Sequence, residues 1–299
     1  MSKKDSFKRY SIIINTLRKH DMDYKSLMEY FKKEEDIYGY KYCVSQRTLR
    51  RDIDEISSIF DIEINYDRSR KVYSINTEEN SLADERLYEA LDTMNALSIN
   101  NNAREYIHFE KRRPQGTENL YGLIHAVKNK KMIHFKYLKY GQINSTARYI
   151  EPLALKEFRN RWYIVGNEKD SVVVKTFCLD RLTELEISSK SFKPLEKFNL
   201  KSFFTNVYGV TNAHNKTPDD VILSFEPIEG KYIKDLPLHE TQEILVDNEQ
   251  EVRVKLNIYP TYEFMMEILS MGANVTVLEP ESFKTQITDM LKRTINNYN

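Results

Sequence analysis

The sequence predicts a multidomain α+β protein, and three patterns along its 299 residues support that fold class. Apolar residues recur at three- and four-residue spacing through the first 60 residues, which indicates amphipathic helices. Short alternating runs between residues 132 and 187 indicate a cluster of strands, and strands alternate with helices after residue 221. At about 100–200 residues per domain, the length favours two or three domains.

The N-terminal segment is predicted to form three helices. The first covers residues 7–19, and the second begins at Tyr24. Asp23 suits the N-cap of the second helix, because its carboxylate can accept hydrogen bonds from the free amides of the first turn. An irregular segment is expected from residue 34 to residue 44. Ser45 is then expected to cap a third helix that runs to about Phe60.

The third helix separates an apolar face from a basic one. At roughly 100° per residue, Leu49, Ile53, Ile56 and Phe60 fall on one face, and Arg47, Arg50, Arg51 and Asp54 fall on the other. An α-helix fits the DNA major groove, and guanidinium groups suit guanine edges and phosphates. Ser45, Gln46 and Thr48 add short hydrogen-bonding groups at the same end. A solvated charged face is the alternative interpretation, and the elements that follow favour DNA binding.

A basic hairpin is predicted directly after these helices. Residues 62–66 alternate like a strand and residues 72–75 return. The loop between them carries Arg68, Arg70 and Lys71, which could reach an adjacent DNA backbone or minor groove. Three helices followed by a hairpin with a basic tip predict a winged helix over residues 1–76.

The middle of the chain is predicted to be rich in strands. Residues 77–119 are expected to form a polar, partly helical linker with an apolar stripe at Leu87, Leu91, Met94 and Leu97, broken at 111–116. A short helix at 120–129 precedes strands at 132–138, 148–155, 162–166, 172–179 and 182–187. Short strands at this spacing suggest a small, strongly bent sheet or a barrel.

The C-terminal part is predicted to be a compact α+β unit that follows a linker near 200–217. Its expected strands are 221–226, 251–258 and 274–278, and its expected helices are 261–271 and 282–297. Gly272 suits the position after the first of these helices, because a left-handed conformation costs glycine little.

Charge is unevenly distributed although the whole chain is neutral. Residues 120–200 carry 15 Lys and Arg against 8 Asp and Glu, whereas residues 215–299 carry 8 against 15. A basic middle region is suited to an anionic partner.

Several segments together resemble one family of regulators. Residues 44–53, VSQRTLRRDI, resemble the recognition helix of DeoR-type winged-helix regulators. Residues 161–164, RWYI, resemble the signature of the WYL domain, with Ile164 in place of the usual Leu. The flanking segments 148–152 and 175–182 also resemble that domain, with Lys175 where Arg is usual. Residues 275–280 resemble the C-terminal extension, or WCX domain, of the same regulators.

The resemblance implies a specific arrangement of domains. An Sm-like, SH3-type β-barrel, the WYL domain, would cover residues 120–200. A ferredoxin-like αβ domain at 213–299 would help form a homodimer. WYL domains are regarded as effector sensors, and some bind single-stranded nucleic acid or nucleotides.

An anionic effector of this kind would be bound by aromatic and basic side chains of the middle region, since stacking plus cations holds nucleotides. The candidates are Tyr137, Arg148, Arg159, Trp162, Tyr163, Lys175 and Arg181. A core position for Trp162 and a structural ion pair between Asp180 and Arg181 are alternatives that stay open.

The sequence lacks the motifs of the common enzyme and metal sites. It has no GxG or GK[ST] loop, no HExxH spacing among its six histidines and no GxSxG. Cys43 and Cys178 stand alone, as is typical of a reducing compartment. We therefore expect no enzyme activity, no cofactor and no metal. Without an apolar run of about 18 residues or an apolar signal core, we expect a cytoplasmic protein.

These observations predict a dimeric, sequence-specific DNA-binding transcriptional regulator of the bacterial or phage kind, and we expect a repressor. Its two N-terminal domains would read the half-sites of a palindromic operator in duplex DNA. Two other classes of function stay open. The chain could bind chiefly single-stranded nucleic acid, or it could hydrolyse nucleic-acid fragments.

Overall fold

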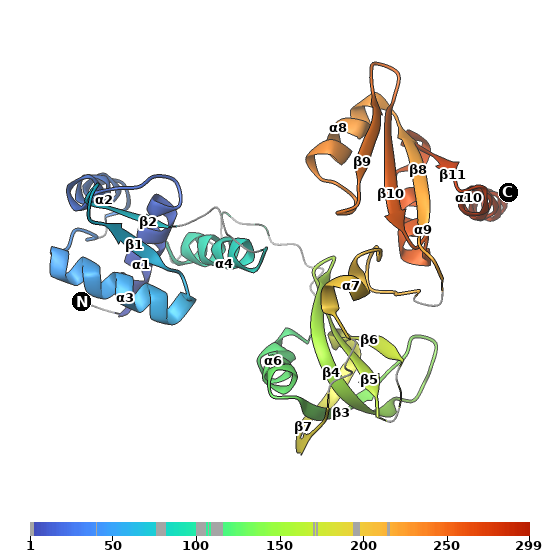
Figure 1. Ribbon diagram of the computed structural model, residues 1–299, viewed down its shortest axis with the longest axis horizontal. Coiled ribbons are helices and arrows are strands. Elements are labelled where there is room, and N and C mark those ends of the chain that lie inside the picture. The colour runs from blue at the N-terminus through green and yellow to red at the C-terminus, as the bar shows by residue number, and fades with distance from the viewer. Residues whose placement is uncertain are drawn as a thin grey trace. The chain divides into compact units, whose positions relative to one another are not determined.

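The computed structural model describes residues 3–39, 41–75, 82–99, 106, 108, 116–169, 171, 173–193, 198–213 and 216–299. The chain divides into two compact units, residues 1–111 and 112–299 (Figure 1). Among the described helices, none has an apolar stretch long enough to cross a membrane. The predicted break at 111–116 lies outside the described residues, apart from Gly116.

The first unit packs its helices against a short hairpin. Its elements are α1 (Lys3–Leu17), α2 (Tyr24–Tyr38), α3 (Gln46–Phe60), β1 (Ile64–Asp67), β2 (Val72–Ile75) and α4 (Leu82–Ile99). The antiparallel hairpin pairs Asp67 with Val72 at its tip. Apolar residues at helical spacing, among them Ile13, Leu27 and Leu49, are fully buried in one core. The predicted three helices and return hairpin are therefore present.

Helix α2 is longer than predicted, and the irregular segment after it is correspondingly shorter. Asp23 is the N-cap as expected, since its side chain accepts from the amide of Ser26. The helix continues through the acidic residues to Tyr38 and ends where Gly39 adopts a left-handed conformation with φ of 71°. The prediction that residues 34–38 are irregular was wrong, because polar residues such as Glu are good helix formers on an exposed face.

The predicted linker begins inside the first unit. In α4, Tyr88 and Leu91 are buried in the core of this unit, whereas Met94 and Leu97 are exposed. The stripe expected from the sequence thus packs through its first half only.

The second unit begins with a five-stranded antiparallel sheet covered by a helix. Its elements are α6 (Leu120–Lys128), β3 (Lys131–Tyr137), β4 (Thr146–Phe158), β5 (Arg161–Glu168), β6 (Val174–Cys178) and β7 (Leu182–Ser191). The strand order is β6-β5-β4-β3-β7. The core side chains include Phe135, Ile150, Ile164 and Phe177, and Leu123 of α6 packs into the same cluster.

The expected closed, Sm-like barrel is not found. Strands β6 and β7 are the two edges of the sheet and do not pair with each other in the described residues. They are joined only by a single 3₁₀ turn, Leu179–Arg181, so the sheet must be strongly curled. This turn directs the chain away from β6 and onto β3, where the amide of Leu138 donates to the carbonyl of Arg181. The fold is a bent, open sheet.

The rest of the second unit is a four-stranded antiparallel sheet with three helices. Its elements are β8 (Asp219–Phe225), α8 (Pro227–Asp235), β9 (Glu243–Asp247), β10 (Val252–Ile258), α9 (Tyr262–Ser270), β11 (Val275–Glu279) and α10 (Glu281–Asn296). The strand order is β11-β8-β10-β9, and the succession β-α-β-β-α-β is that of ferredoxin-like units. Gly272 has φ of 60°, as predicted for the end of the helix.

Two elements of this part, α8 and β9, were missed. Helix α8 contains Gly230, a poor helix former, and a Cβ there would lie 2.3 Å from Cγ2 of Val252. Only glycine lets this helix approach β10 so closely.

Candidate DNA-contact and ligand-binding surfaces

The N-terminus of α3 is capped as predicted. The Ser45 hydroxyl accepts from the amide of Thr48 at 3.2 Å, and the two hydroxyls lie 3.0 Å apart. Two of the predicted DNA contacts, Ser45 and Thr48, therefore already hold the helix end in shape. Gln46 is exposed beside them.

Three arginines form an exposed face on α3. Arg47, Arg50 and Arg51 are exposed, while Leu49 and Ile56 on the opposite side are fully buried. Arg51 lies near Glu55, with 3.7 Å between Nε and Oε1. Among the described residues, Arg47 and Arg50 have no carboxylate within ion-pair distance. Their guanidinium groups are available to an anionic partner.

The hairpin tip is basic but only partly available. Arg70 pairs with Asp67 at 2.8 Å and with Asp21 at 2.7 Å. Hydrogen bonds from Ser69 and Arg70 hold the pKa of Asp67 far below its ordinary value, so its carboxylate stays charged in more acidic solution than that of an ordinary aspartate. Arg68 and Lys71 are exposed and form no ion pair within the described part of the chain.

A buried ion pair behind α3 was missed by the sequence analysis. Arg9 of α1 donates to both carboxylate oxygens of Asp52, at 2.5 and 3.1 Å, and both side chains are 0% exposed. A signal was available, because Asp52 lies three residues after Leu49 and four before Ile56, on the packed side of the helix. This pair fixes α3 to α1 below the arginine face.

In the five-stranded sheet, two predicted effector residues share one carboxylate. Glu168 at the end of β5 pairs with Arg148 of β4 at 2.5 Å and with Lys175 of β6 at 2.7 Å. Hydrogen bonds from Lys175 and then Arg148 lower the pKa of Glu168. The register places Arg148 opposite Phe135 and Glu168 opposite Ile150, so these groups lie on the concave face.

Arg181 joins the same region through aromatic rings. Its guanidinium lies 5.1 Å from the ring centroid of Tyr137 and 4.6 Å from that of Tyr140. Asp180 is 3.9 Å from Arg181 and pairs more closely with Arg161. Tyr137 is buried and its hydroxyl accepts from the amide of Cys178 at 3.2 Å.

The remaining three candidates lie elsewhere. Trp162 packs against the core of the sheet. Tyr163 faces the other side of β5, opposite Cys178, and burial raises its pKa to about 12. Arg159 pairs with Glu267 of α9. The structure thus brings together four of the seven predicted effector residues, namely Tyr137, Arg148, Lys175 and Arg181.

A pocket of about 280 Å³ is bounded by two of these four residues, Tyr137 and Lys175, and by a segment that was predicted to be a linker. Tyr137 and Lys175 line it together with Phe203, Val210 and Asn212. Phe203 belongs to α7 (Leu200–Phe204), a short helix that was not predicted. The apolar residues in segment 203–210 were the available signal.

Glu263 holds this segment in place. Its Oε2 accepts from the amides of Val210 and Thr211 at 2.9 and 3.0 Å. Gly209 has φ of 89°, and a Cβ there would lie 2.4 Å from the same oxygen. The close approach of Glu263 therefore requires glycine at this position.

We expect Gly209→Ala to destabilise the second unit by about 1–3 kcal/mol, because backbone strain and a collision with Glu263 add. Urea unfolding followed by the fluorescence of Trp162 measures the change. Gly141→Ala is the matched control, since Gly141 has φ of 79° with nothing within 4 Å of its Cβ. Equal losses in both variants would show that the Glu263 contact contributes nothing.

Comparison with known families identifies two domains in the second unit. Residues 118–187 match the WYL domain and residues 217–295 match the WCX domain. The predicted resemblance is confirmed for these two domains, and the DeoR-type N-terminal domain stays a prediction.

Two solved structures are similar to the chain. Proteasome accessory factor B/C (PafBC) of Arthrobacter aurescens is 18% identical, with 95% of this chain and 45% of that chain covered and a TM-score of 0.35. A CRISPR Cas-related protein is 11% identical, with 98% and 92% covered and a TM-score of 0.40. The chain thus spans less than half of the PafBC chain, and these scores are too low to support an argument about function. No curated protein matches.

Proposed function

We propose that this protein is a transcriptional regulator that binds duplex DNA through α3 and binds an anionic effector through its WYL domain. The observation that carries the proposal is the exposed face of α3, where Arg47 and Arg50 form no ion pair with a described residue while the opposite side is packed. Arginines without a carboxylate partner can reach base edges and phosphates without first breaking an ion pair.

The domains would divide this work. Residues 1–76 would form the winged helix, with α3 in the major groove and Arg68 and Lys71 at an adjacent backbone. Residues 77–119 would be the linker, 120–200 the WYL domain and 213–299 a dimerisation domain. A dimer would read two half-sites, and we expect it to repress transcription.

The effector would bind at the concave face of the WYL sheet. Glu168 occupies Arg148 and Lys175 as an internal anion, so a phosphate or other anionic group would compete with it. Arg181 with Tyr137 and Tyr140 supplies a cation beside aromatic rings, a combination suited to nucleotides or single-stranded nucleic acid. Binding there would change DNA affinity by a coupling free energy.

Arg181→Ala is expected to abolish the response to effector and leave DNA affinity without effector unchanged, because Arg181 lies outside the first unit. The measurement is fluorescence anisotropy of a labelled operator duplex, with and without an unlabelled single-stranded oligonucleotide. Lys190→Ala, at an exposed position of the same domain, is the control. An unchanged response in Arg181→Ala would exclude Arg181 from the effector site.

The proposal itself is tested by comparing duplex with single strand. The full chain is titrated against a labelled duplex from the region upstream of its own coding sequence and against each separated strand, at one salt concentration. Tighter binding to the duplex supports a DNA-reading regulator. Tighter binding to the single strands would favour the alternative that the chain binds chiefly single-stranded nucleic acid. The observation that supports this alternative is the group of cations and aromatic rings around Arg181.

A further inference from the structure

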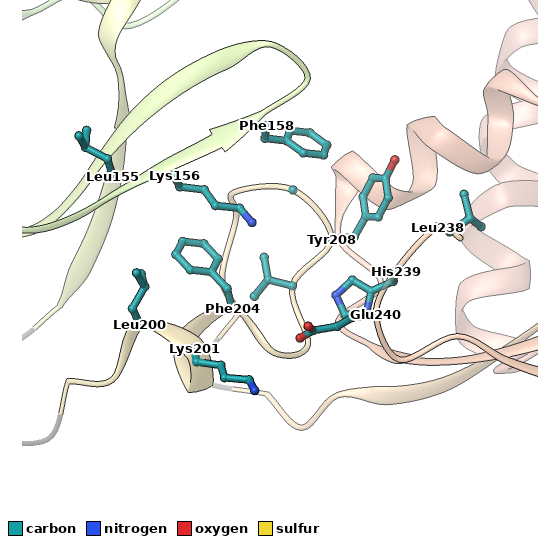
Figure 2. A pocket seen from close by; sticks show the side chains of 12 residues that line it. Leu155, Lys156, Phe158, Leu200, Lys201, Phe204, Tyr208, Leu238, His239 and Glu240 are labelled. Atoms are coloured by element: carbon teal, nitrogen blue, oxygen red, sulfur yellow. The ribbon is translucent and has the colours of Figure 1, made fainter. Parts of the chain in front are cut away.

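A second pocket of about 430 Å³ lies in the second unit (Figure 2). It is lined by β4, α7, the segment after α7 and the turn that precedes β9. The lining residues are Leu155, Lys156, Phe158, Leu200, Lys201, Phe204, Val207, Tyr208, Gly209, Leu238, His239 and Glu240. None of the predicted effector residues is among them.

The pocket has apolar walls suited to a flat ring. Figure 2 shows the rings of Phe158 and Phe204 on either side of Lys156. Leu200 and Leu238 extend the apolar surface. Such walls bury the body of a small ligand and leave its orientation to a few polar groups.

The walls are fixed before any ligand binds. Tyr208 packs edge-on against Phe158 and Phe264, with ring centroids 5.6 and 5.2 Å apart. Asn206 donates to the backbone carbonyl of Asn257 at 2.8 Å, and Glu263 holds the amides that follow Gly209. A pocket built on held segments binds without a large ordering cost.

Lys156 is the partly buried cation of this pocket. It is half-buried, and its Nζ lies 5.0 Å from the ring centroid of Phe204. It forms no ion pair with any described residue. Burial lowers its pKa, although the charges of Glu157 and Glu240 oppose that shift. A partly desolvated ammonium gains most from a ligand that brings a negative charge.

The other ionisable groups in the lining are already engaged or lie at the rim. His239 Nδ1 accepts from the amide of Thr241 at 3.2 Å, and burial lowers the pKa of this imidazole. The imidazole of His239 therefore lines the pocket as an uncharged group. Lys201 and Glu240 are exposed at the mouth, where water screens them.

We infer that this pocket binds a small aromatic carboxylate, with the ring against Phe158 and Phe204 and the carboxylate on Nζ of Lys156. The site is separate from the effector surface proposed above. It would join the WYL sheet to the turn before β9 in the WCX domain, so a ligand there would strengthen the contact between the two domains.

Isothermal titration calorimetry of the full chain with 2-naphthoate, without DNA, tests this site independently of the proposed function. Lys156→Met should weaken binding at least about tenfold, because a charge-assisted hydrogen bond is lost. Lys156→Arg keeps the charge and should bind within about threefold of the parent. The neutral analogue 2-naphthamide should bind the parent and Lys156→Met alike.

Two further variants complete the test. Lys139→Met, in the lining of the other pocket, should leave 2-naphthoate binding unchanged. Phe204→Ala should weaken both compounds, and circular dichroism verifies that each variant is folded. Absence of saturable binding of 2-naphthoate to the parent, or equal affinities of the parent and Lys156→Met, would overturn the inference.

Discussion

Replacing Asp52 with alanine is expected to destabilise the first unit by about 3–5 kcal/mol, the largest stability effect that we predict. The side chains of Arg9 and Asp52 are completely buried and joined by two hydrogen bonds. Removing the carboxylate takes away the counter-charge that Asp52 supplies to a buried guanidinium. Most of the cost comes from burying a charge that has lost this compensation, not from the loss of the pair itself.

Urea unfolding followed by helical circular dichroism measures this effect. Asp54→Ala is the matched control, because Asp54 is exposed on the same helix. The double variant Arg9→Met/Asp52→Leu should recover much of the lost stability, since it removes both charges together. If Asp52→Ala unfolds at the same urea concentration as Asp54→Ala, the buried pair does not hold α3 in place.

Replacing Arg47 and Arg50 together with alanine is expected to weaken DNA binding at least about tenfold, since each arginine that reads a base contributes about 1–3 kcal/mol. Both side chains are exposed at the N-terminal half of α3, opposite its buried face. Where a replaced arginine contacts phosphate, the plot of the logarithm of affinity against the logarithm of salt concentration should become less steep. Its slope should change by about one for each lost contact. Fluorescence anisotropy at several salt concentrations measures both quantities.

Arg70→Ala is the comparison for this double variant. Arg70 is basic and exposed in the same unit, but it is already paired with Asp21 and Asp67. We therefore expect it to contribute less to DNA binding than Arg47 or Arg50. An effect of Arg70→Ala as large as that of the double variant would place the DNA contact at the hairpin tip and not on α3.

Features set by local sequence were predictable. The caps at Asp23 and Ser45, the apolar face of α3 and the strand Val72–Ile75 follow from residues near one another in the chain. The buried pair of Arg9 and Asp52 was not predicted, because charged residues are usually exposed and the partners are 43 residues apart.

Features set by packing between distant segments were missed. In helix α8, the side chain of Val252 occupies the space that a Cβ at Gly230 would need. The open edge of the five-stranded sheet depends on how one 3₁₀ turn redirects the chain, which strand spacing does not reveal. The ion pairs that Arg148 and Lys175 form with Glu168 likewise depend on the register of β4, β5 and β6.

The most direct measurement of DNA reading by α3 is an electrophoretic mobility shift of the full chain. The duplex from its own upstream region is compared with a scrambled duplex of equal composition at one physiological salt concentration, since phosphate contacts make affinity steeply salt-dependent. We predict a shift of the upstream duplex at protein concentrations that leave the scrambled duplex free. Equal binding of the two duplexes, or none of either, would contradict sequence-specific recognition by this protein.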